Sequence, residues 1–487
     1  MTMPASPPSD GHRPAWRRCA DRLFDPVSVA SLVVFRILFG TIMVWEVLRY
    51  ANRGWIEAFY LDPEFLFTYY GFEWLAPLGG VGLHWLFYGL GVLAAMIAVG
   101  AFYRIATILF FLGFTYVFLL DQARYLNHFY LVSLVAFLMC FIPAHRAWSV
   151  DAVLRKGFWS DTVPRWSIWL LIVQFEIMYI FAGLVKINGD WLRLEPMSMW
   201  LGNRTDFLFI GPLFAYQPVV AIAAYGVILL HVVGAPLLLW KRTRPWVFSL
   251  YVAFHFANHL LFQIGIFPWL AIAGTLMFFE PDWPRRFARL ARDRLAAAGA
   301  AIGDIADRAR KAAPPYRATP SLILRTVVIA GVACWTLFQI LMPMRHHLYP
   351  GDTSWHEQGH RFAWQMKLRQ KSATTVFMVA DPATGDVWKI DPLDYLSDRQ
   401  DRYMAGRPDM ILQFAHHLED VWAEEYGIED VEVRALSFAS LNGREPQLLV
   451  DPSRDLTEIE RSLAPADWIM PLTEPLRRPE SQVADGG

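Results

Sequence analysis

The stretch WSIWLLIVQFEIMYIFAGLVKINGDW, residues 166–191, decides the fold class of this chain. Its first part, 166–187, is an apolar run long enough to cross a bilayer whose hydrocarbon core is about 30 Å thick. Lys186 lies at the end of that run, although an ammonium group is costly in hydrocarbon. The stretch therefore predicts a transmembrane helix and raises the question of what holds a lysine there.

The composition of the whole chain also indicates a membrane protein. Of its 487 residues, 55% are hydrophobic and only 18% are charged, which is too little charge to cover a soluble protein of this length. The cysteines have neither the spacing of metal ligands nor that of a disulfide framework. They are Cys19, Cys140 and Cys334.

Apolar segments along the chain predict about nine transmembrane helices. They fall near 27–48, 81–101, 104–121, 126–143, 166–187, 218–240, 245–267 and 321–343, with a shorter crossing at 269–280. Lys and Arg collect in cytoplasmic loops, and here they concentrate in the N-terminal tail, 144–165, 241–244 and 282–320. This alternation places the N-terminus in the cytoplasm and the C-terminus outside.

The predicted fold class is a mainly α membrane protein followed by a small extracytoplasmic α+β domain. From residue 344 onward the chain reads as a soluble domain, with hairpin turns around 382–385 and at Asn442-Gly443. We expect the multi-pass protein in the plasma (inner) membrane of a bacterium. Its expected parts are a basic cytoplasmic tail (1–26), a transmembrane domain of about eight spans (27–280), a basic cytoplasmic connector (281–320), a last transmembrane helix (321–343) and the extracytoplasmic domain (344–487).

Polar residues inside the apolar segments form the candidate site. Lys186 either extends its amine to the interface or keeps it buried. RYLNHFYL places Asn127 and His128 at the start of one span, and FHFANHLLF places His255, Asn258 and His259 along one face of another. An amine, imidazoles and carboxamides near one bilayer depth predict a polar pocket with apolar walls.

A buried lysine has a definite chemistry. Desolvation lowers the pKa of a buried amine, so that its neutral form can act as a base. A lipid-soluble hydroquinone is a weakly acidic phenol from which such an amine can take a proton. Other polar residues in the spans have structural interpretations: Arg36 and Glu176 as a buried ion pair, Glu46 close enough to a span end to reach water, and His231 as a hydrogen-bonded core residue.

A second motif points to a metal. His356-Glu357-Gln358-Gly359-His360 matches the H-E-x-x-H pattern of zinc proteases. That pattern requires a helix, so that both imidazoles share a face. Here it follows Pro350-Gly351 and contains Gly359. We therefore expect no metal, although His416 or His417 remains a conceivable third ligand.

Several motifs taken together resemble the vitamin K-dependent γ-glutamyl carboxylase family, including bacterial proteins that share its transmembrane domain. The resemblance runs from about Phe24 to about Leu472. It is carried by FAGLVKINGDW, LNHFYL, FHFANHLLFQIGIF, EPDWPRR, GHRFAWQM, and DPSRDL followed by WIMPL.

The resemblance implies a carbon–carbon lyase with coupled quinol epoxidation. Such an enzyme oxygenates reduced vitamin K, a naphthohydroquinone, to its epoxide, removes the γ-proton of a glutamate side chain and adds CO2 to the carbanion. Reduced vitamin K is then the cofactor, O2 and CO2 are co-substrates, and no metal is needed. The expected partners are membrane lipid, the quinol and a glutamate-containing peptide or protein, without nucleic acid.

The resemblance also implies roles for individual residues. Lys186 matches the lysine that deprotonates the hydroquinone, with the Asn127-His128 pair beside it. His255 and Asn258 match polar positions on a pocket-lining helix that also carries His259. Trp364 and Met366 match the segment with which the outer domain covers the pocket mouth.

Two departures keep the acceptor substrate open. Animal members have two adjacent lysines where this chain has Val185-Lys186, and Lys367 replaces a second methionine. Besides the carboxylase, a quinol epoxidase without protein carboxylation and a non-catalytic quinone or lipid binder remain alternatives, and a transporter is disfavoured because no repeats are visible.

Overall fold

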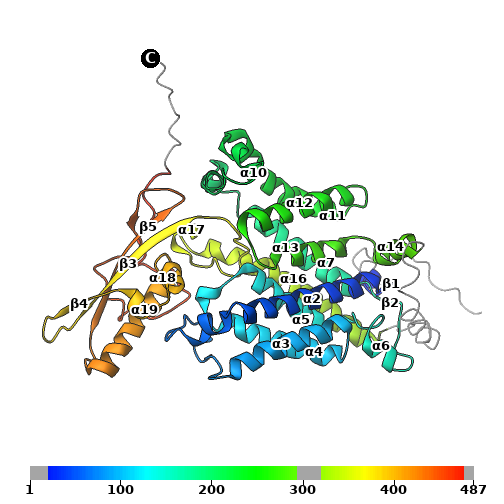
Figure 1. Ribbon diagram of the computed structural model, residues 1–487, viewed down its shortest axis with the longest axis horizontal. Coiled ribbons are helices and arrows are strands. Elements are labelled where there is room, and N and C mark those ends of the chain that lie inside the picture. Colours follow the sequence, from blue (N-terminus) through cyan, green and yellow to red (C-terminus); the bar gives the residue numbers. More distant parts are fainter. Residues whose placement is uncertain (1–19, 293–319, 477–487) are drawn as a thin grey trace, which may run out of the picture.

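The computed structural model describes residues 20–292 and 320–476, and most of the predicted tail and connector lies outside these ranges. Long helices run side by side along the longest axis of the molecule, and a sheet lies at one end of this bundle (Figure 1). We call the opposite end, where β1 (Pro26–Ser28) pairs with β2 (Thr162–Pro164), the far end of the bundle.

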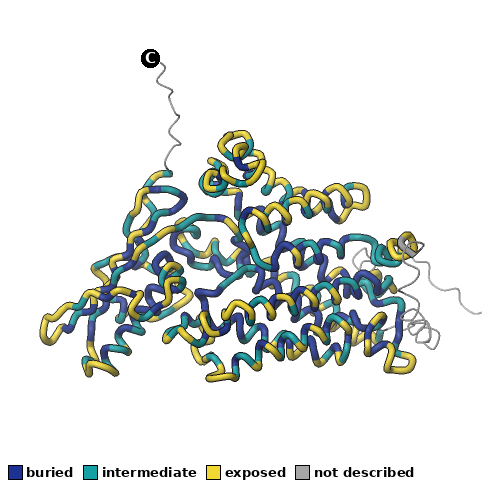
Figure 2. The backbone as a smooth tube through the Cα atoms, viewed as in Figure 1, coloured by how far each residue is buried: buried dark blue, intermediate teal, exposed yellow. Residues whose placement is uncertain are grey.

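The bundle is built from apolar helices. They are α2 (Ala30–Asn52), α3 (Gly82–Val99), α4 (Tyr103–Leu119), α5 (Asn127–Phe141), α7 (Trp166–Leu184), α10 (Gln217–Leu229), α11 (Ala235–Leu238), α12 (Arg244–Phe262), α13 (Phe267–Thr275) and α16 (Leu322–Met344). Their outer faces stay exposed while their contacting faces are buried (Figure 2).

Five helices of the described chain are long and apolar enough to cross a membrane. They span Ala30–Asn52, Gly82–Val99, Trp166–Leu184, Gln217–Leu238 and Leu322–Leu348. Shorter apolar helices cover Tyr103–Leu119, Asn127–Phe141 and Phe267–Phe278. The chain is thus a multi-pass membrane protein, whereas the predicted count of nine spans stays a prediction.

Close packing brings the end of α13 toward α7. A Cβ atom at Gly274 would lie 2.1 Å from the ring of Phe175, so only glycine allows the two helices to approach this closely. Phe267, in the first turn of the same helix, is also part of the buried core.

The C-terminal region folds around a four-stranded antiparallel sheet of order β4-β3-β5-β6. Its strands are β3 (Lys371–Ala380), β4 (Val387–Ile390), β5 (Glu432–Leu441) and β6 (Gln447–Leu448). Helices α18 (Asp398–Met404) and α19 (Pro408–Val421) belong to the same region. Both predicted hairpin turns are present, since Gly385, Asn442 and Gly443 adopt positive φ angles between paired strands.

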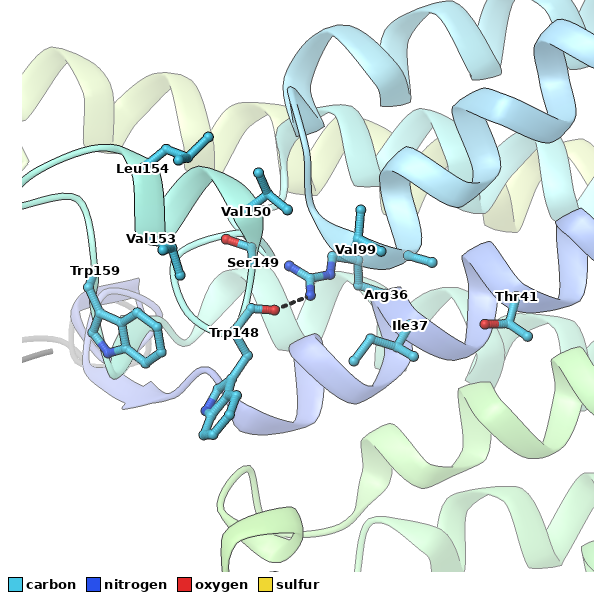
Figure 3. Close-up of a pocket in the computed structure, with 11 residues that line it drawn as sticks. Arg36, Ile37, Thr41, Val99, Trp148, Ser149, Val150, Val153, Leu154 and Trp159 are labelled. Atoms are coloured by element: carbon cyan, nitrogen blue, oxygen red, sulfur yellow. Dashed lines mark hydrogen bonds between the residues drawn. The ribbon is translucent and has the colours of Figure 1, made fainter. Parts of the chain in front are cut away.

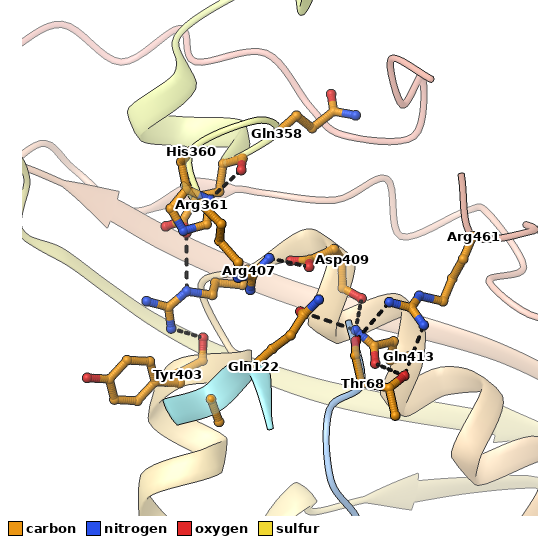
Figure 4. Close-up of polar contacts among 12 residues, drawn as sticks. Thr68, Gln122, Gln358, His360, Arg361, Tyr403, Arg407, Asp409, Gln413 and Arg461 are labelled. Atoms are coloured by element: carbon orange, nitrogen blue, oxygen red, sulfur yellow. Dashed lines mark hydrogen bonds and ion pairs between the residues drawn. The ribbon is translucent and has the colours of Figure 1, made fainter. Parts of the chain in front are cut away.

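Polar contacts tie this domain to the bundle. Arg444 forms a two-pronged ion pair with Asp190, with Nη1 2.6 Å from Oδ2 and Nη2 2.7 Å from Oδ1. On another side, Arg461 donates to the hydroxyl and carbonyl oxygens of Thr68 (Figure 4). The orientation of the domain over the bundle is therefore set by directional bonds.

Two sequence predictions about buried charges are wrong. Arg36 does not pair with Glu176, because the carbonyls of Ala144 and Trp148 bind its guanidinium instead. Glu46 does not reach water, since it is 3% exposed and binds Arg49 on the next turn of α2. The sequence pattern does not specify the carbonyls that bind Arg36 or the side chain that binds Glu46.

His231 follows the structural interpretation. Its Nδ1 lies 2.8 Å from the carbonyl oxygen of Val227, one turn earlier in the same helical segment. A Cβ at the facing Gly183 would lie 2.7 Å from the Cβ of His231, so this histidine lies close against α7.

Candidate functional site

Lys186 lies just beyond the end of α7 and turns its amine inward. The residue is only 5% exposed. Its Nζ donates to the carbonyl oxygens of Ala182 and Met366, each at 2.8 Å. The amine therefore does not extend to bulk water, and both acceptors are neutral.

The sequence that follows explains this turn. Asn188 caps the short helix α8 (Gly189–Leu192) by accepting from the backbone N–H groups of Asp190 and Trp191. Capping by asparagine fixes the direction in which the chain enters such a helix. The turn places the ring of Trp191 5.2 Å from the Lys186 Nζ, where it forms an aromatic wall.

Asn127 is the first residue of α5 and reaches the same loop as Lys186. Its Nδ2 is 3.4 Å from the carbonyl oxygen of Gln365, and its Oδ1 accepts from the Tyr125 hydroxyl at 3.1 Å. Asn127 and Lys186 thus bind the carbonyls of consecutive residues, Gln365 and Met366. One loop of the C-terminal domain joins the two candidate residues from different helices.

The loop that supplies these carbonyls has an unusual backbone. Phe362, Trp364 and Lys367 have φ angles of 63°, 56° and 44°, in the left-handed region that bulky residues rarely adopt. Trp364 is fully buried, and its ring centroid lies 5.0 Å from that of Tyr130 on α5. Packing against the bundle thus stabilises a strained loop, as is common at functional sites.

His128 and His255, on different helices, share one aromatic neighbour. The ring centroid of Phe267 lies 6.3 Å from that of His128 and 5.7 Å from that of His255. His255 is fully buried, and its Nε2 lies 3.3 Å from the Tyr179 hydroxyl. That hydroxyl also lies 2.7 Å from the Thr275 hydroxyl, so the polar residues continue into the bundle as a network.

The remaining histidine and amide of α12 are not among the hydrogen-bond partners of Lys186 in the described part of the chain. The ring of His259 packs 5.4 Å from Trp269, and Asn258 is half-buried on the same helix. Lys367, which follows the 364–366 loop, contacts this helix, because its Nζ lies 4.7 Å from the ring centroid of Phe262. The structure therefore joins Lys186, Asn127 and the 364–366 loop directly, while His255, Asn258 and His259 lie on a neighbouring helix.

Several buried polar atoms of these residues have no hydrogen-bond partner among the described residues. Buried polar groups are nearly always satisfied, so such atoms indicate a ligand or water. They are His128 Nε2, His255 Nδ1, His259 Nδ1, Trp364 Nε1 and Gln365 Oε1. Together with the aromatic walls, they can bind a flat molecule that has polar groups at its edges.

Sequence reasoning missed Tyr179 and Gln365. Tyr179 lies seven positions before Lys186, a spacing that places both on one side of a helix and offered a usable signal. Gln365 carried no such signal, because its role depends on a loop whose path no periodicity describes.

The H-E-x-x-H motif is not helical. Helix α17 (Thr353–His356) ends inside the motif, and Glu357 has a φ of 60°. Among the described residues, no group of three or more His, Cys, Asp or Glu is arranged to hold a metal. The side chain of Glu357 instead has cations as partners.

These partners form what we call the Glu357 cluster: Glu357, His360, Arg369, Lys371 and Arg407. The Glu357 carboxylate lies 2.8 Å from Arg369 Nη2 and 3.2 Å from Arg407 Nε. Lys371 Nζ and His360 Nε2 lie 3.8 and 3.4 Å from it. Burial alone would raise the pKa of Glu357, but Arg369 and Arg407 hold it well below its ordinary value. Figure 4 shows His360 and Arg407 of this cluster.

Two family models match the chain. The HTTM domain matches residues 24–283, and the lumenal domain of vitamin K-dependent gamma-carboxylase matches residues 324–475. Lys186 and Asn127 lie in the first match and Met366 lies in the second, so the loop contact described above joins the two. No solved structure matches the chain.

Proposed function

This chain belongs to the vitamin K-dependent gamma-carboxylase family, and we propose that it is a membrane enzyme that epoxidises a reduced naphthoquinone with O2. We propose further that epoxidation is coupled to addition of CO2 at a glutamyl carbanion. The observation that carries the proposal is the burial of the Lys186 amine against the loop that also binds Asn127.

The residues fit the proposed cofactor. A hydroquinone is a flat apolar ring with a hydroxyl at each end, so its site needs aromatic walls and separate polar contacts. Trp191 and Phe267 supply such walls. The unpartnered atoms of His128 and Gln365 supply polar contacts that burial would otherwise penalise.

When bound, the reduced naphthoquinone supplies the electrons that reduce O2 and, during its oxidation to the epoxide, a base strong enough to remove a γ-proton of glutamate. The chain's own part begins with Lys186. A neutral amine has two N–H groups, and two carbonyl oxygens at 2.8 Å are available to accept them. Its lone pair then points away from both carbonyls and can take a proton from a hydroxyl.

The same two carbonyls keep the protonated amine in place. Among the described residues no carboxylate pairs with Lys186, and desolvation favours the neutral amine. The protonated state is therefore not locked by an ion pair, and Lys186 can pass the proton on. A proton acceptor that must be regenerated needs this balance.

Asn127 and His128 have positioning roles in this proposal. The Tyr125 hydroxyl and the Gln365 carbonyl fix both ends of the Asn127 carboxamide. His128 is 7% exposed, and its Nε2 has no partner among the described residues. These groups would orient the diol and polarise one of its oxygens, while the 364–366 loop excludes water.

A quinol epoxidase without protein carboxylation is the second candidate. Lys367 stands where the family has a second methionine, and its ammonium lies over the rings of Trp200 and Phe262 beside the loop. This change concerns the outer face of the loop and leaves the contacts of Lys186 intact. An amine that extends to the interface would favour a non-catalytic binder, and the 5% exposure of Lys186 does not support that alternative.

One assay separates the candidates. The purified full chain in lipid nanodiscs receives reduced vitamin K under air, with or without a glutamyl peptide and labelled bicarbonate. Epoxide and peptide-bound label are both expected. Epoxide without fixed label leaves only the epoxidase, and binding of the quinone without epoxide refutes the catalytic proposal.

A further inference from the structure

The far end of the bundle contains a cavity that the proposed function does not use. It has a volume of about 560 Å³ and lies between α2, the end of α3 and the short helix α6 (Val150–Leu154) (Figure 3). Its walls are mostly apolar and partly exposed. Ile37, Val99, Val150, Val153, Leu154 and Trp148 are between 37% and 73% exposed.

A buried cation lies behind these walls. Arg36 is fully buried and lines the cavity. Its Nη2 donates to the Trp148 carbonyl at 2.5 Å and its Nη1 to the Ala144 carbonyl at 3.3 Å. Its Nε has no acceptor among the described residues. Because both bonded acceptors are neutral, the guanidinium keeps its full positive charge.

The neighbouring charged groups do not cancel this charge. The single carboxylate of Asp151, whose oxygens accept from the backbone N–H groups of Phe102 and Tyr103 at 2.9 and 3.0 Å, acts on Arg36 through space and offsets part of the positive charge. Arg104, which donates to the Cys140 carbonyl, adds a second cation nearby. The region therefore has an excess of positive charge.

The backbone is shaped around the guanidinium. A Cβ atom at Gly100 would lie 2.3 Å from Arg36 Nη1, and Gly100 has a φ of 69°. Trp148 has a φ of 48°, which a tryptophan rarely adopts, and its carbonyl faces Arg36. A structural tether accounts for the two bound N–H groups. It accounts neither for the Nε–H without an acceptor nor for an open apolar cavity beside the guanidinium.

We infer that this cavity binds an anionic phospholipid from the membrane leaflet opposite the C-terminal domain. One acyl chain would lie against Ile37, Val99 and Val153, with the phosphate drawn toward Arg36. Arg36 lies six residues into α2, about 9 Å from the helix start at 1.5 Å per residue, near the boundary between headgroups and acyl chains. An exposed tryptophan such as Trp148 is typical of that boundary.

The chemistry selects this lipid class. Apolar walls reject a hydrated free anion, while an uncancelled guanidinium favours a phosphate with a net negative charge over a zwitterionic headgroup. The inference does not rest on the proposed enzymatic function, because α2, α3 and α6 line the cavity, whereas Lys186 binds a loop of the C-terminal domain.

The test uses the full chain purified in a neutral detergent. Native mass spectrometry measures binding of dioctanoyl phosphatidylglycerol, of phosphatidylcholine with the same acyl chains, and of inorganic phosphate. Phosphatidylglycerol should bind about fivefold more tightly than phosphatidylcholine, as expected for one cation near the headgroup. Inorganic phosphate alone should not bind measurably.

A cavity-filling variant locates the site. Val153→Trp places a large ring in the cavity and leaves Arg36 and its carbonyl contacts in place, whereas Leu112→Trp adds the same ring on the exposed face of α4. Val153→Trp should abolish the preference for phosphatidylglycerol, and Leu112→Trp should keep it. Equal binding of both lipids, binding of phosphate alone, or an unchanged preference in Val153→Trp overturns the inference.

Discussion

Lys186 and Glu357 are both buried ionisable residues, but their surroundings differ in kind. The amine of Lys186 has two carbonyl acceptors and no carboxylate partner among the described residues. The carboxylate of Glu357 is surrounded by Arg369, Arg407 and Lys371. A buried charge with matched partners is fixed in one protonation state, whereas a buried amine with neutral partners can gain and lose a proton.

The two regions are also connected. The loop that binds Lys186 through Met366 begins near Glu357 and leads directly to Arg369 and Lys371. The Glu357 cluster therefore fixes both ends of the strained loop, and Lys186 binds the Met366 carbonyl between them. This gives the cluster a positioning role for the proposed site, while the chemistry stays with the amine.

The largest effect on activity is expected from Lys186→Met. It removes the proposed proton acceptor, and general base catalysis contributes roughly 10²- to 10⁴-fold, so epoxide formation should fall by at least ~10²-fold. Lys367→Met is the matched control, because it removes an exposed amine from the same loop region. Both variants should give monodisperse protein. Epoxidation by Lys186→Met at the rate of the Lys367→Met protein would remove Lys186 from the mechanism.

The largest effect on stability is expected from Glu357→Gln. This change leaves Arg369, Arg407 and Lys371 without their common carboxylate, and breaking a buried ion pair costs about 3–5 kcal/mol. Denaturant unfolding followed by tryptophan fluorescence measures the loss. Glu458→Gln, at an exposed position of the same domain, should change the free energy of unfolding by only about 0.5 kcal/mol. Equal stability of the two variants would show that the cluster is not a stabilising element.

Acid should remove the difference in unfolding free energy between wild type and Glu357→Gln. Its pKa in the folded protein lies well below 4.5, so the stability it contributes is fully present above the pKa of the unfolded carboxyl, near 4.3. That contribution is lost as the pH falls through the lower folded pKa. The gap in unfolding free energy between wild type and Glu357→Gln should therefore be constant from pH 5 to 7 and shrink below about pH 4.

A smaller loss is expected from Asn127→Ala. Asn127 touches the loop beside the carbonyl that binds Lys186, so its loss should misplace the quinol and slow epoxidation by roughly tenfold to a hundredfold. The rate should fall without a change in its pH dependence, because the base remains. A changed pH profile would mean that Asn127 acts on the proton rather than on position.

The sequence predicted individual residues and turns better than it predicted the partners of buried charges. The end of an apolar run was sufficient to single out Lys186, and the two hairpin turns followed from local turn chemistry. The partners of Arg36 and Glu46 could not be predicted, because helix periodicity gives the depth of a charge but not which loop carbonyl or neighbouring side chain reaches it first. The resemblance implied that Trp364 and Met366 lie at the pocket mouth. The path of the loop could not be predicted from the residues themselves, because the three left-handed residues between 362 and 367 depend on packing against the bundle.

The smallest effect is expected from Tyr179→Phe. This variant tests whether the internal network has a structural role, like the Glu357 cluster, or takes part in proton transfer with Lys186. The Tyr179 hydroxyl lies within hydrogen-bond distance of Thr275 and His255. Its removal should cost about 1 kcal/mol of stability, the usual net value of a hydrogen bond. If the network only stabilises the helices, in the way that the Glu357 cluster stabilises its loop, epoxidation stays within a few-fold of wild type. A loss of activity approaching that of Lys186→Met, at unchanged stability, would instead extend the proton-handling site from Lys186 through Tyr179 into the bundle.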